Sequence, residues 1–516
     1  MTVLTSLRNL ALATCAGALL AAGCVQAAPP ATTMLRVDAS ARATAFPHFW
    51  ERMFGSGRAS LALRDDYRKD LVAVREATGF GYVRFHGIFD RDVGLVRREP
   101  DGRIAYNFSY VDQIYDGLLE RGVKPFVELG FMPEELTSDP KAIHAFWYHP
   151  NVAPPRDYAE WDAMIAAFAR HLVGRYGIDE VASWYFEVWN EPNIGFWTGS
   201  PAQSAYFTLY DHTARALKAV SPRLRVGGPA TAQAAWIPDF LAHVHKDKVP
   251  VDFVSTHVYG DDTADNVFHT REAIPRADMV CRAVDKVHRE IAASPYPRMP
   301  LVFSEYNASY ANLPNVTDTV YMGPWMANTI RECAGKVDLM SYWSFSDVFE
   351  EQGVVRNPFY GGFGLIAANR IAKPAFNAFA MLHRLGEERL AVDSDAALVT
   401  RRGDGTLVLA LWNYAPEAGN TASYTPGQPA GAAKHFAIAV RHLPAAARAT
   451  VWRLDATHGN AVAAFDRMGR PDFPSREQIA QLRKAAQPAA PEHLDVRDGK
   501  LELDIPPQGL AVIELR

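Results

Sequence analysis

The chain has 516 residues, 48 % of them hydrophobic, so it can form two or three domains with sizeable cores, and intrinsic disorder is a poor description of it. Its 53 Lys and Arg against 58 Asp and Glu give a net charge of -5, which provides no basic surface for nucleic acid or anionic lipid. The sequence therefore disfavours a polyanion-binding protein and predicts no nucleic-acid partner.

Residues 1–28 have the order of charge, apolar run and small residues that is typical of a secretory signal. Arg8 is followed by an apolar stretch ending at Ala22, which is too short to span a bilayer comfortably. We favour cleavage after Ala27 over lipid attachment at Cys24, because the usual Leu three residues before that Cys is missing. The protein is expected to be exported, to the periplasm or the medium, without membrane insertion of the mature domain; a lipoprotein anchored through Cys24 is the alternative.

Between residues 49 and 386 one rhythm repeats: a short apolar run, a break at Gly, Pro or Asn, and an amphipathic stretch. Eight such units, with no Gly-rich dinucleotide fingerprint after any run, favour a (β/α)8 barrel over a doubly wound sheet. The predicted fold class is therefore α/β, with residues 49–386 as a catalytic TIM barrel. The predicted strands are 52–55, 82–85, 124–127, 184–189, 224–227, 251–255, 301–304 and 339–343.

The clearest predicted helix spans 158–176, where apolar residues recur at steps of three and four, beginning with Trp161 and Ile165. Asp157 and Glu160 at its start have the spacing of a capping box, with Asp in the place of Ser or Thr. We therefore expect a capped helix to cover the barrel here.

After Gly386 the pattern changes to short alternating strands separated by loops of Pro, Gly and Ala. Residues 387–516 are therefore predicted to form an accessory all-β sandwich domain. The N-terminal segment 29–48 alternates in the same way and is expected to join this β domain. One insertion, at about 473–487, is predicted to be a helix that starts at Ser475.

Two cysteines, Cys281 and Cys333, lie outside the predicted signal; they are far apart in the sequence and belong to no CxxC motif. Neither a zinc site nor a disulfide scaffold is indicated. We expect two buried thiols, and the alternative that an oxidising compartment allows is a disulfide between them.

In a barrel of this class the active site lies at the carboxyl ends of the strands. Polar and aromatic residues gather after six of the predicted strands: Arg58, His86, Asn190 with Glu191, His257 with Tyr259, Glu305, and Trp343 with Glu350 and Glu351. Glu191 and Glu305 are expected at the same mouth. Glycosidic cleavage needs such a pair, because one acid protonates the leaving oxygen while the other carboxylate attacks or activates water. The pKa values of the two must differ, so that one stays protonated near neutral pH.

Five motifs at these strand ends carry a family resemblance: Arg84-Phe-His-Gly-Ile88, Trp184-Tyr-Phe-Glu-Val-Trp-Asn-Glu-Pro-Asn193, His257-Val-Tyr259, Ser304-Glu-Tyr-Asn307 and Tyr342-Trp-Ser-Phe-Ser-Asp-Val-Phe-Glu-Glu351. Together they resemble glycoside hydrolase family thirty-nine, which comprises β-xylosidases and α-L-iduronidases of a retaining clan. The resemblance covers the whole barrel and extends to the closing segment of the β domain, Ile505–Ile513.

The resemblance implies that Glu191 is the general acid/base and Glu305 the nucleophile of a double displacement, with their carboxyls about 5 to 5.5 Å apart. It further implies that Asn190 bonds the sugar 2-hydroxyl, that Tyr259 orients the nucleophile and that His257 lines the site.

Four more residues are implied to hold the sugar. His86 would bond ring hydroxyls, and Trp343 would offer a flat floor to the ring. Glu350 and Glu351 resemble the acidic pair with which family xylosidases grip the distal hydroxyls and close the pocket. Of the two we favour Glu350, because successive residues rarely face the same way.

Two residues near these motifs are expected to play other parts. Glu187, four residues before Glu191, is predicted to be a buried carboxylate paired with an Arg such as Arg84. Tyr360 stands where the family often has His, which leaves the exact sugar open.

The sequence shows no constellation of metal ligands, and the expected mechanism needs no cofactor. The leading hypothesis is a retaining exo-acting β-D-xylosidase that releases xylose from xylo-oligosaccharides. The alternatives are an α-L-arabinofuranosidase, an α-L-iduronidase-like enzyme, an endo-acting enzyme with an open groove, and a non-catalytic carbohydrate-binding protein. Glu350 and Glu351 would repel the carboxylate of a uronic acid, and a non-catalytic protein would be expected to lack one carboxylate of the pair. The oligomeric state stays open.

Overall fold

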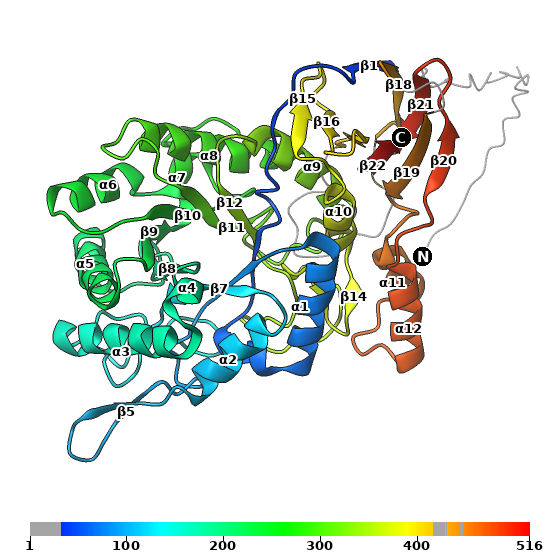
Figure 1. Ribbon diagram of the computed structural model, residues 1–516. Coiled ribbons are helices and arrows are strands. Elements are labelled where there is room, and N and C mark those ends of the chain that lie inside the picture. The colour runs from blue at the N-terminus through cyan, green and yellow to red at the C-terminus, as the bar shows by residue number, and fades with distance from the viewer. Residues whose placement is uncertain (1–31, 416–428, 430, 444–446) are drawn as a thin grey trace, which may run out of the picture.

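The computed structural model describes residues 32–415, 429, 431–443 and 447–516. Its centre is a closed barrel of eight strands with helices around it, and further sheets lie to one side (Figure 1). The predicted signal segment, including Cys24, lies outside the described residues. Within the described ranges, no helix is both long and apolar enough to cross a bilayer.

The barrel confirms the predicted fold class, and each of the eight predicted strands overlaps an observed one. In chain order the strands are β3 Met53–Gly55, β4 Tyr82–Phe85, β7 Lys124–Leu129, β8 Tyr185–Val188, β9 Arg225–Thr231, β10 Phe253–Tyr259, β11 Leu301–Asn307 and β12 Leu339–Tyr342. Neighbouring strands pair in parallel all the way round. β9, β10 and β11 run past their predicted ends, because polar residues such as His257 and Glu305 continue the strands on the inside of the barrel.

The inward-facing side chains form layers, because alternate residues of a strand point to the same side. The layer nearest the amino ends of the strands is apolar and comprises Met53, Tyr82, Phe126, Tyr185, Phe253, Val302 and Leu339. On β9 the corresponding residue is Gly227. The Cβ of any other residue would lie only 2.4 Å from the carbonyl oxygen of Phe253, so a side chain does not fit there. Two residues farther along, Arg84, Glu128, Glu187 and Ser304 form a buried polar layer. The apolar layer thus lies directly below the charged residues, which are nearer the carboxyl ends of the strands.

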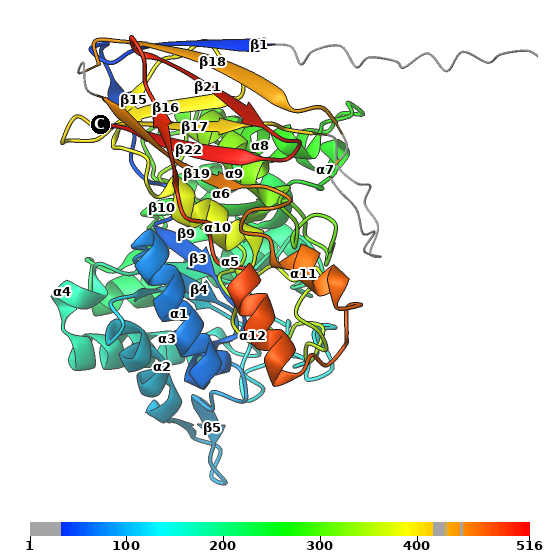
Figure 2. The same ribbon diagram turned by 90° about the vertical axis from the view of Figure 1, so that its right-hand side faces the viewer.

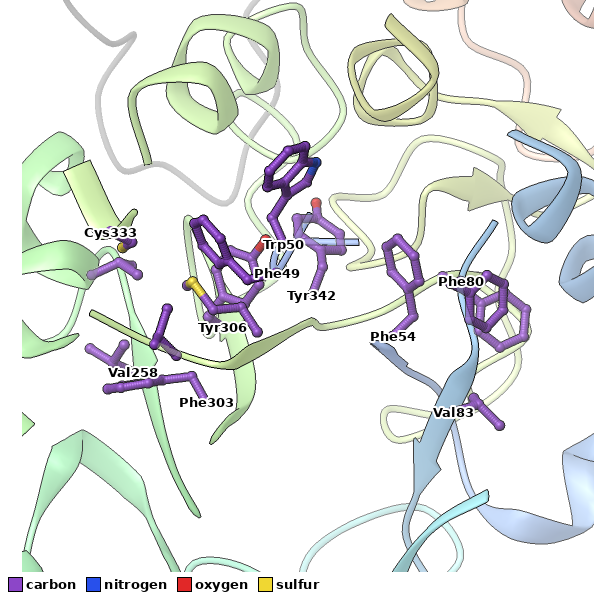
Figure 3. Close-up of a cluster of buried hydrophobic side chains, with 14 of the residues drawn as sticks. Phe49, Trp50, Phe54, Phe80, Val83, Val258, Phe303, Tyr306, Cys333 and Tyr342 are labelled. Atoms are coloured by element: carbon purple, nitrogen blue, oxygen red, sulfur yellow. The ribbon is translucent and has the colours of Figure 1, made fainter. Parts of the chain in front are cut away.

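A larger apolar core lies between the strands and the surrounding helices. Figure 3 shows part of it, with Phe54 and Val83 on barrel strands beside Phe80. Phe54 meets Phe80 edge to face at 5.1 Å, and Tyr306 meets Tyr342 in the same way at 5.8 Å. Burying each such side chain stabilises the fold by about 1.5 to 3 kcal/mol. This core fixes the strands that carry the site.

Ten helices of the described chain belong to the barrel half: α1 Asp65–Thr78, α2 Ser109–Leu119, α3 Tyr158–Tyr176, α4 Ile178–Val181, α5 Ala202–Val220, α6 Ile237–Lys246, α7 Ala264–Phe268, α8 Arg276–Ala292, α9 Met322–Cys333 and α10 Pro374–Leu382. α3 has the predicted bounds, and Asp157 caps it by accepting from the N–H of Ala159 at 2.7 Å. The other half of the predicted capping box is wrong, because Glu160 does not bond the backbone N–H of Asp157. Its carboxylate accepts from Arg98 and Arg156, which attract it more strongly than a backbone N–H does.

Short elements complete the barrel half. They are the 3-10 turns η1 Ala59–Leu63 and η2 Ala232–Ala234 and the two-stranded pairs β5 Val96–Arg98 with β6 Ile104–Tyr106 and β13 Ile366–Ala367 with β14 Ile371–Ala372.

The β domain consists of two sheets, which Figure 2 shows as layers above the barrel. The three-stranded sheet has the order β1 Thr32–Asp38, β18 Lys434–Arg441, β21 Lys500–Ile505; the seven-stranded sheet has the order β2 Thr44–Ala45, β15 Glu388–Leu390, β16 Ala397–Arg401, β17 Leu407–Trp412, β22 Leu510–Leu515, β19 Arg448–Leu454, β20 Glu492–Asp495. β1 pairs in parallel with β18, and β2 pairs with β15. The segment before the barrel therefore adds a strand to each sheet.

Two helices, α11 Ala461–Arg467 and α12 Arg476–Ala485, are inserted in the β domain and lie beside the barrel (Figures 1 and 2). Ser475 caps α12 in a complete capping box, as its position in the sequence predicts. The pair packs on the segment that follows β12: Arg470 donates to the carbonyl of Phe359 at 3.0 Å, and Arg483 donates to that of Asn369 at 2.6 Å.

Cys281 of α8 and Cys333 of α9 form a disulfide bond. The expectation of two free thiols is therefore wrong. Sequence separation hid the pair, because the two helices cover neighbouring strands of the barrel and their facing sides bring both cysteines into the same apolar core.

Candidate active site

A pocket of about 330 Å³ opens at the carboxyl ends of the barrel strands. This volume lies at the lower end of the range for small-molecule sites. Seven of the nine predicted site residues line it: His86, Asn190, Glu191, Tyr259, Glu305, Trp343 and Glu351. The other two, His257 and Glu350, do not.

Glu191 and Glu305 lie close together, with one carboxylate oxygen of each within 4.8 Å of the other. Glu305 stands on β11 opposite His257 of β10 in the strand register. Glu191 follows β8 in a left-handed backbone conformation with a φ of 44°, and its N–H donates to the carbonyl of Ala230 at 2.8 Å. An oxygen pair this close agrees with the roughly 5 to 5.5 Å between the carboxyls of retaining enzymes better than with the roughly 6.5 to 9.5 Å of inverting ones.

Arg84 is fully buried beneath this pair and contacts three carboxylates. Its nitrogens lie 2.6 Å from Glu187, 2.6 Å from Glu305 and 2.9 Å from Glu128. It also donates to Oδ1 of Asn190 at 2.9 Å. The predicted pairing of Glu187 with Arg84 is confirmed. A single cation does not balance three carboxylates, and burial raises the pKa of Glu128 well above its usual range, which favours the neutral acid there.

The surroundings separate the acidities of Glu191 and Glu305. Burial, and then the charge of Glu305, raise the pKa of Glu191 well above that of a free carboxyl. Burial also raises the pKa of Glu305, but the charge of Arg84 and the O–H of Tyr259, which donates at 2.6 Å, favour its ionised form. Near neutral pH, Glu191 is therefore the better proton donor and Glu305 the better carboxylate.

His257 lies behind the pocket, so the expectation that it lines the site is wrong. The polar layer of the barrel encloses it completely, and burial lowers its pKa well below that of a free imidazole. The hydroxyl of Ser304 donates to Glu187 at 2.5 Å and can only accept from Nε2 of His257, 3.1 Å away. Nδ1 is then the acceptor, and it faces Glu191 at 3.0 Å. The imidazole therefore favours a proton on Glu191.

His86 presents one nitrogen to the pocket and binds the protein with the other. Nδ1 lies 2.6 Å from Glu128, whereas Nε2 lies 3.8 Å from both Glu305 and Glu351. Burial lowers the pKa of His86 to about 3, so the ring is neutral. A neutral ring fixed in this way can bond a hydroxyl group in the pocket.

Trp343 forms a wall of the pocket directly after β12. Its indole lies over Gly55 at the end of β3, where a Cβ would come within 2.1 Å of the ring. The ring of His86 lies 4.9 Å from it, and Phe363 adds a second aromatic surface. Tyr360, the departure from the family pattern, is half-buried and does not line the pocket.

The structure separates Glu350 from Glu351, and the preference for Glu350 is wrong. Glu350 has a left-handed backbone with a φ of 66° and turns its carboxylate away to Arg64 and Arg58. Glu351 is buried and lines the pocket beside His86. Successive residues do face apart, as expected, but the two arginines determine which of them points outward.

Sequence reasoning missed several residues of the site. Glu128 holds His86, and Asp262 lines the pocket and accepts from the N–H of Tyr259 at 2.8 Å. Phe146 and Tyr310 come from loops. Glu128 could have been found, since it lies two residues beyond the apolar Phe126 and thus faces the same interior. The loop residues carry no such periodic signal.

Two groups of residues in the described chain bring three metal-ligand atoms within 4.8 Å of one another. One is Glu191, His257 and Glu305, where the guanidinium of Arg84 already supplies the positive charge. The other is His48, Glu51 and His383 at the opposite end of the barrel, where both imidazoles bond the carboxylate of Glu51. Ordinary hydrogen bonds and ion pairs account for both groups.

Comparison with known proteins agrees with the geometry. The model of Glycosyl hydrolases family 39 matches residues 33–499. A beta-xylosidase of Geobacillus stearothermophilus is 40 % identical over 471 residues, which are 89 % of this chain and 90 % of that protein. A monomeric beta-xylosidase from Caulobacter crescentus superposes with a TM-score of 0.85 at 35 % identity, covering 94 % of this chain and 99 % of that one. A family 39 enzyme from Xanthomonas axonopodis pv. citri gives a TM-score of 0.85 at 34 % identity, covering 97 % and 100 %.

The match extends over the barrel and the β domain alike, so it does not rest on the barrel fold, which unrelated enzymes share. Paired carboxyls that differ in acidity are the chemistry that this family requires. The chain therefore belongs to glycosyl hydrolases family 39 and is a glycoside hydrolase.

Proposed function

We propose that the protein is a retaining, exo-acting β-D-xylosidase that removes terminal xylose from xylo-oligosaccharides. The observation that carries the proposal is the arrangement of Glu191 and Glu305, which lie close enough for double displacement and differ in the protonation state that their neighbours favour. That the relatives named beta-xylosidase span nearly the whole chain supports the choice of sugar.

In the first step the carboxylate of Glu305 attacks the anomeric carbon, and the carboxyl of Glu191 gives its proton to the departing glycosidic oxygen. A covalent glycosyl-enzyme and a free alcohol result. In the second step the carboxylate of Glu191 takes a proton from water, whose oxygen attacks the same carbon and releases Glu305. Two inversions give net retention of configuration.

The neighbours of this pair support the same mechanism. Oδ1 of Asn190 is occupied by Arg84, so its amide nitrogen is left to donate to a substrate hydroxyl. The role proposed for it is to bond the 2-hydroxyl, a contact that strengthens in the transition state.

Closure of the pocket at the sugar end supports exo action. Phe146 lines the pocket, and the N–H of the next residue, Trp147, donates to the carbonyl of Glu351 at 2.8 Å. The guanidinium of Arg58 lies 4.9 Å over the ring of Tyr148 and braces the same loop. These contacts tie the loops after β7 and β12 together at this side of the pocket, which supports exo action.

Charge argues against a uronic acid as the bound sugar. No Lys or Arg is among the described residues that line the pocket, whereas Glu351 is. A substrate carboxylate would therefore lose its hydration in this pocket without gaining a compensating cation. The presence of both catalytic carboxylates argues against a non-catalytic binding protein. An α-L-arabinofuranoside stays the alternative substrate, since its hydroxyl layout overlaps with that of xylose.

The test is the initial rate on an aryl β-D-xylopyranoside for the intact chain and for the variants Glu191→Ala and Glu305→Ala. We expect each variant to lose about a hundredfold or more in rate. Azide added to Glu305→Ala should yield a glycosyl azide of inverted configuration, and azide added to Glu191→Ala one of retained configuration. Glu134→Ala, which changes an exposed carboxylate of a mouth loop, is the matched control and should keep the full rate. An active Glu305→Ala variant would contradict the assignment of the nucleophile.

A further inference from the structure

The two halves of the pocket differ in whether the apolar side chains that line them are buried or exposed. On the side of β4 and β12, the lining residues His86, Trp343 and Glu351 are buried. On the arc from β8 to β11, two large apolar lining residues remain exposed, Ile194 at 41 % and Tyr310 at 60 %. Ligand pockets are lined mainly by apolar and aromatic side chains, so these two residues are suited to contact a ligand.

The roles of the catalytic pair decide which part of the substrate meets this arc. The sugar ring lies against Trp343 and Glu351, and Glu191 must reach the glycosidic oxygen, so the leaving group extends past Glu191 toward the loops after β8 to β11. Ile194 stands in this path, because its N–H donates to the carbonyl of Glu191 at 3.2 Å.

Tyr310 is held in place at the rim. Its N–H donates to Asp261 at 3.0 Å, and the neighbouring Ser309 donates to the same carboxylate at 2.6 Å. The edge of the Tyr310 ring meets the ring of Tyr259, with centroids 6.5 Å apart and planes at 85°. An aromatic side chain on an anchored backbone has few torsions left to fix, so it loses little conformational entropy when it contacts a ligand.

Several polar groups of the same arc are engaged with one another, whereas the amide of Asn266 lines the pocket and is exposed. The amide of Gln233 donates to Asp262 at 3.3 Å, and the other oxygen of Asp262 accepts from the backbone of Tyr259. The hydroxyl of Thr263 accepts from the N–H of Asn266 at 3.2 Å as a helix cap. A second sugar needs partners for several hydroxyls, whereas an aromatic leaving group needs only apolar surface.

We propose that Ile194 and Tyr310 form a subsite for aromatic leaving groups, so that the enzyme cleaves β-xylosides of phenols and aromatic alcohols in preference to xylobiose. This rests on the proposed function for the identity of the sugar and goes beyond it for the leaving group.

The test compares kcat/KM for 2-phenylethyl β-D-xyloside, methyl β-D-xyloside and xylobiose. The leaving groups of the first two substrates are alcohols of similar basicity, and only one of them has an aromatic ring. The ratio of their kcat/KM values therefore reports contact with the leaving group rather than the reactivity of the bond. We expect the 2-phenylethyl compound to be preferred about tenfold, and Tyr310→Ser and Ile194→Ser each to lose most of this preference. Val354→Ser removes an apolar residue that is 71 % exposed on the loop after β12 and does not line the pocket, and it should keep the preference.

Equal or faster cleavage of xylobiose by the intact enzyme, or an equal effect of Tyr310→Ser on all three substrates, would overturn the proposal. If no xyloside is cleaved, the proposed choice of sugar fails. The subsite is then tested by comparing 2-phenylethyl and methyl glycosides of the sugar that the enzyme does cleave.

Discussion

At the scale of single residues, the protonation of Glu191 depends on its neighbours more than on its own side chain. Burial is the largest cause of its raised pKa, and the charges of Glu305 and Asp262 add to it. The neutral ring of His257 accepts a hydrogen bond from the protonated form. Changes in these neighbours should therefore move one limb of the pH-rate profile at a time.

Asp262→Asn should move the alkaline limb of kcat/KM to lower pH. Burial raises the pKa of Asp262 to about 7, so near neutrality it carries part of a negative charge that raises the pKa of Glu191. Without that charge Glu191 loses its proton at lower pH, and the alkaline limb reports this loss. The pH profile on an aryl xyloside checks it, with Asp265→Asn on the nearby exposed surface as the control. An alkaline limb that stays in place would show that Asp262 does not act on Glu191.

Tyr259→Phe should move the acid limb to higher pH. The phenol of Tyr259 donates to Glu305 and lowers the pKa of that carboxyl, so its removal makes Glu305 bind a proton at higher pH. The same profile measures the shift, and Tyr310→Phe, which removes a phenol oxygen without a bond to Glu305, should leave the acid limb unchanged. A shift in the opposite direction would refute this role of Tyr259.

At the scale of elements, one buried ion cluster ties the loop after β12 to the start of α10. Nζ of Lys373 lies 2.8 Å from Asp318, 3.1 Å from Asp347 and 2.6 Å from the carbonyl of Gly362. All three charged side chains are fully buried. The cluster fixes the segment that carries Trp343 and Glu351 on the pocket wall.

Lys373→Met should destabilise the protein by about 3 to 5 kcal/mol, because it leaves two carboxylates buried without their cation. Lys69→Met, which breaks the exposed pair with Asp65, should cost less than about 1 kcal/mol. Unfolding in urea measures both. Similar losses in the two variants would mean that the buried cluster contributes no more than a surface pair.

Sequence patterns predicted the barrel elements better than the loops between them. The strand around Tyr185 follows from its apolar and aromatic run, and the helix from Tyr158 to Tyr176 follows from the helical repeat of its apolar residues. The loop after β12 has no repeat, so nothing in the pair Glu350-Glu351 tells which carboxylate faces the pocket. Arg58 and Arg64, which are distant in sequence, decide it by pairing with Glu350.

At the scale of the whole molecule, the disulfide between Cys281 and Cys333 joins two neighbouring barrel helices across 52 residues. Disulfides persist in oxidising compartments, which supports our proposal that the chain is exported. The mass of the mature protein isolated from its natural host tests this: a chain that begins at Ala28 indicates a soluble product, and an acylated Cys24 a lipoprotein.

Replacing both cysteines by Ser should destabilise the protein by about 4 kcal/mol, the loop entropy that a cross-link of this span removes from the unfolded chain. Urea unfolding with and without a reductant measures the effect. The intact chain under reducing conditions should match the double variant. If the reductant has no effect on the intact chain, the bond does not contribute to stability.

The sequence by itself predicted the order of elements and the position of Glu191 and Glu305 at the same end of the barrel. Apolar periodicity is a local property, and Glu191 and Glu305 each follow an apolar run whose carboxyl end must lie at the barrel mouth. Tertiary structure alone decided the places of His257 and Glu350 and the bond between Cys281 and Cys333. These depend on contacts between segments far apart in the chain, and no local pattern encodes the direction in which a side chain points after its strand ends.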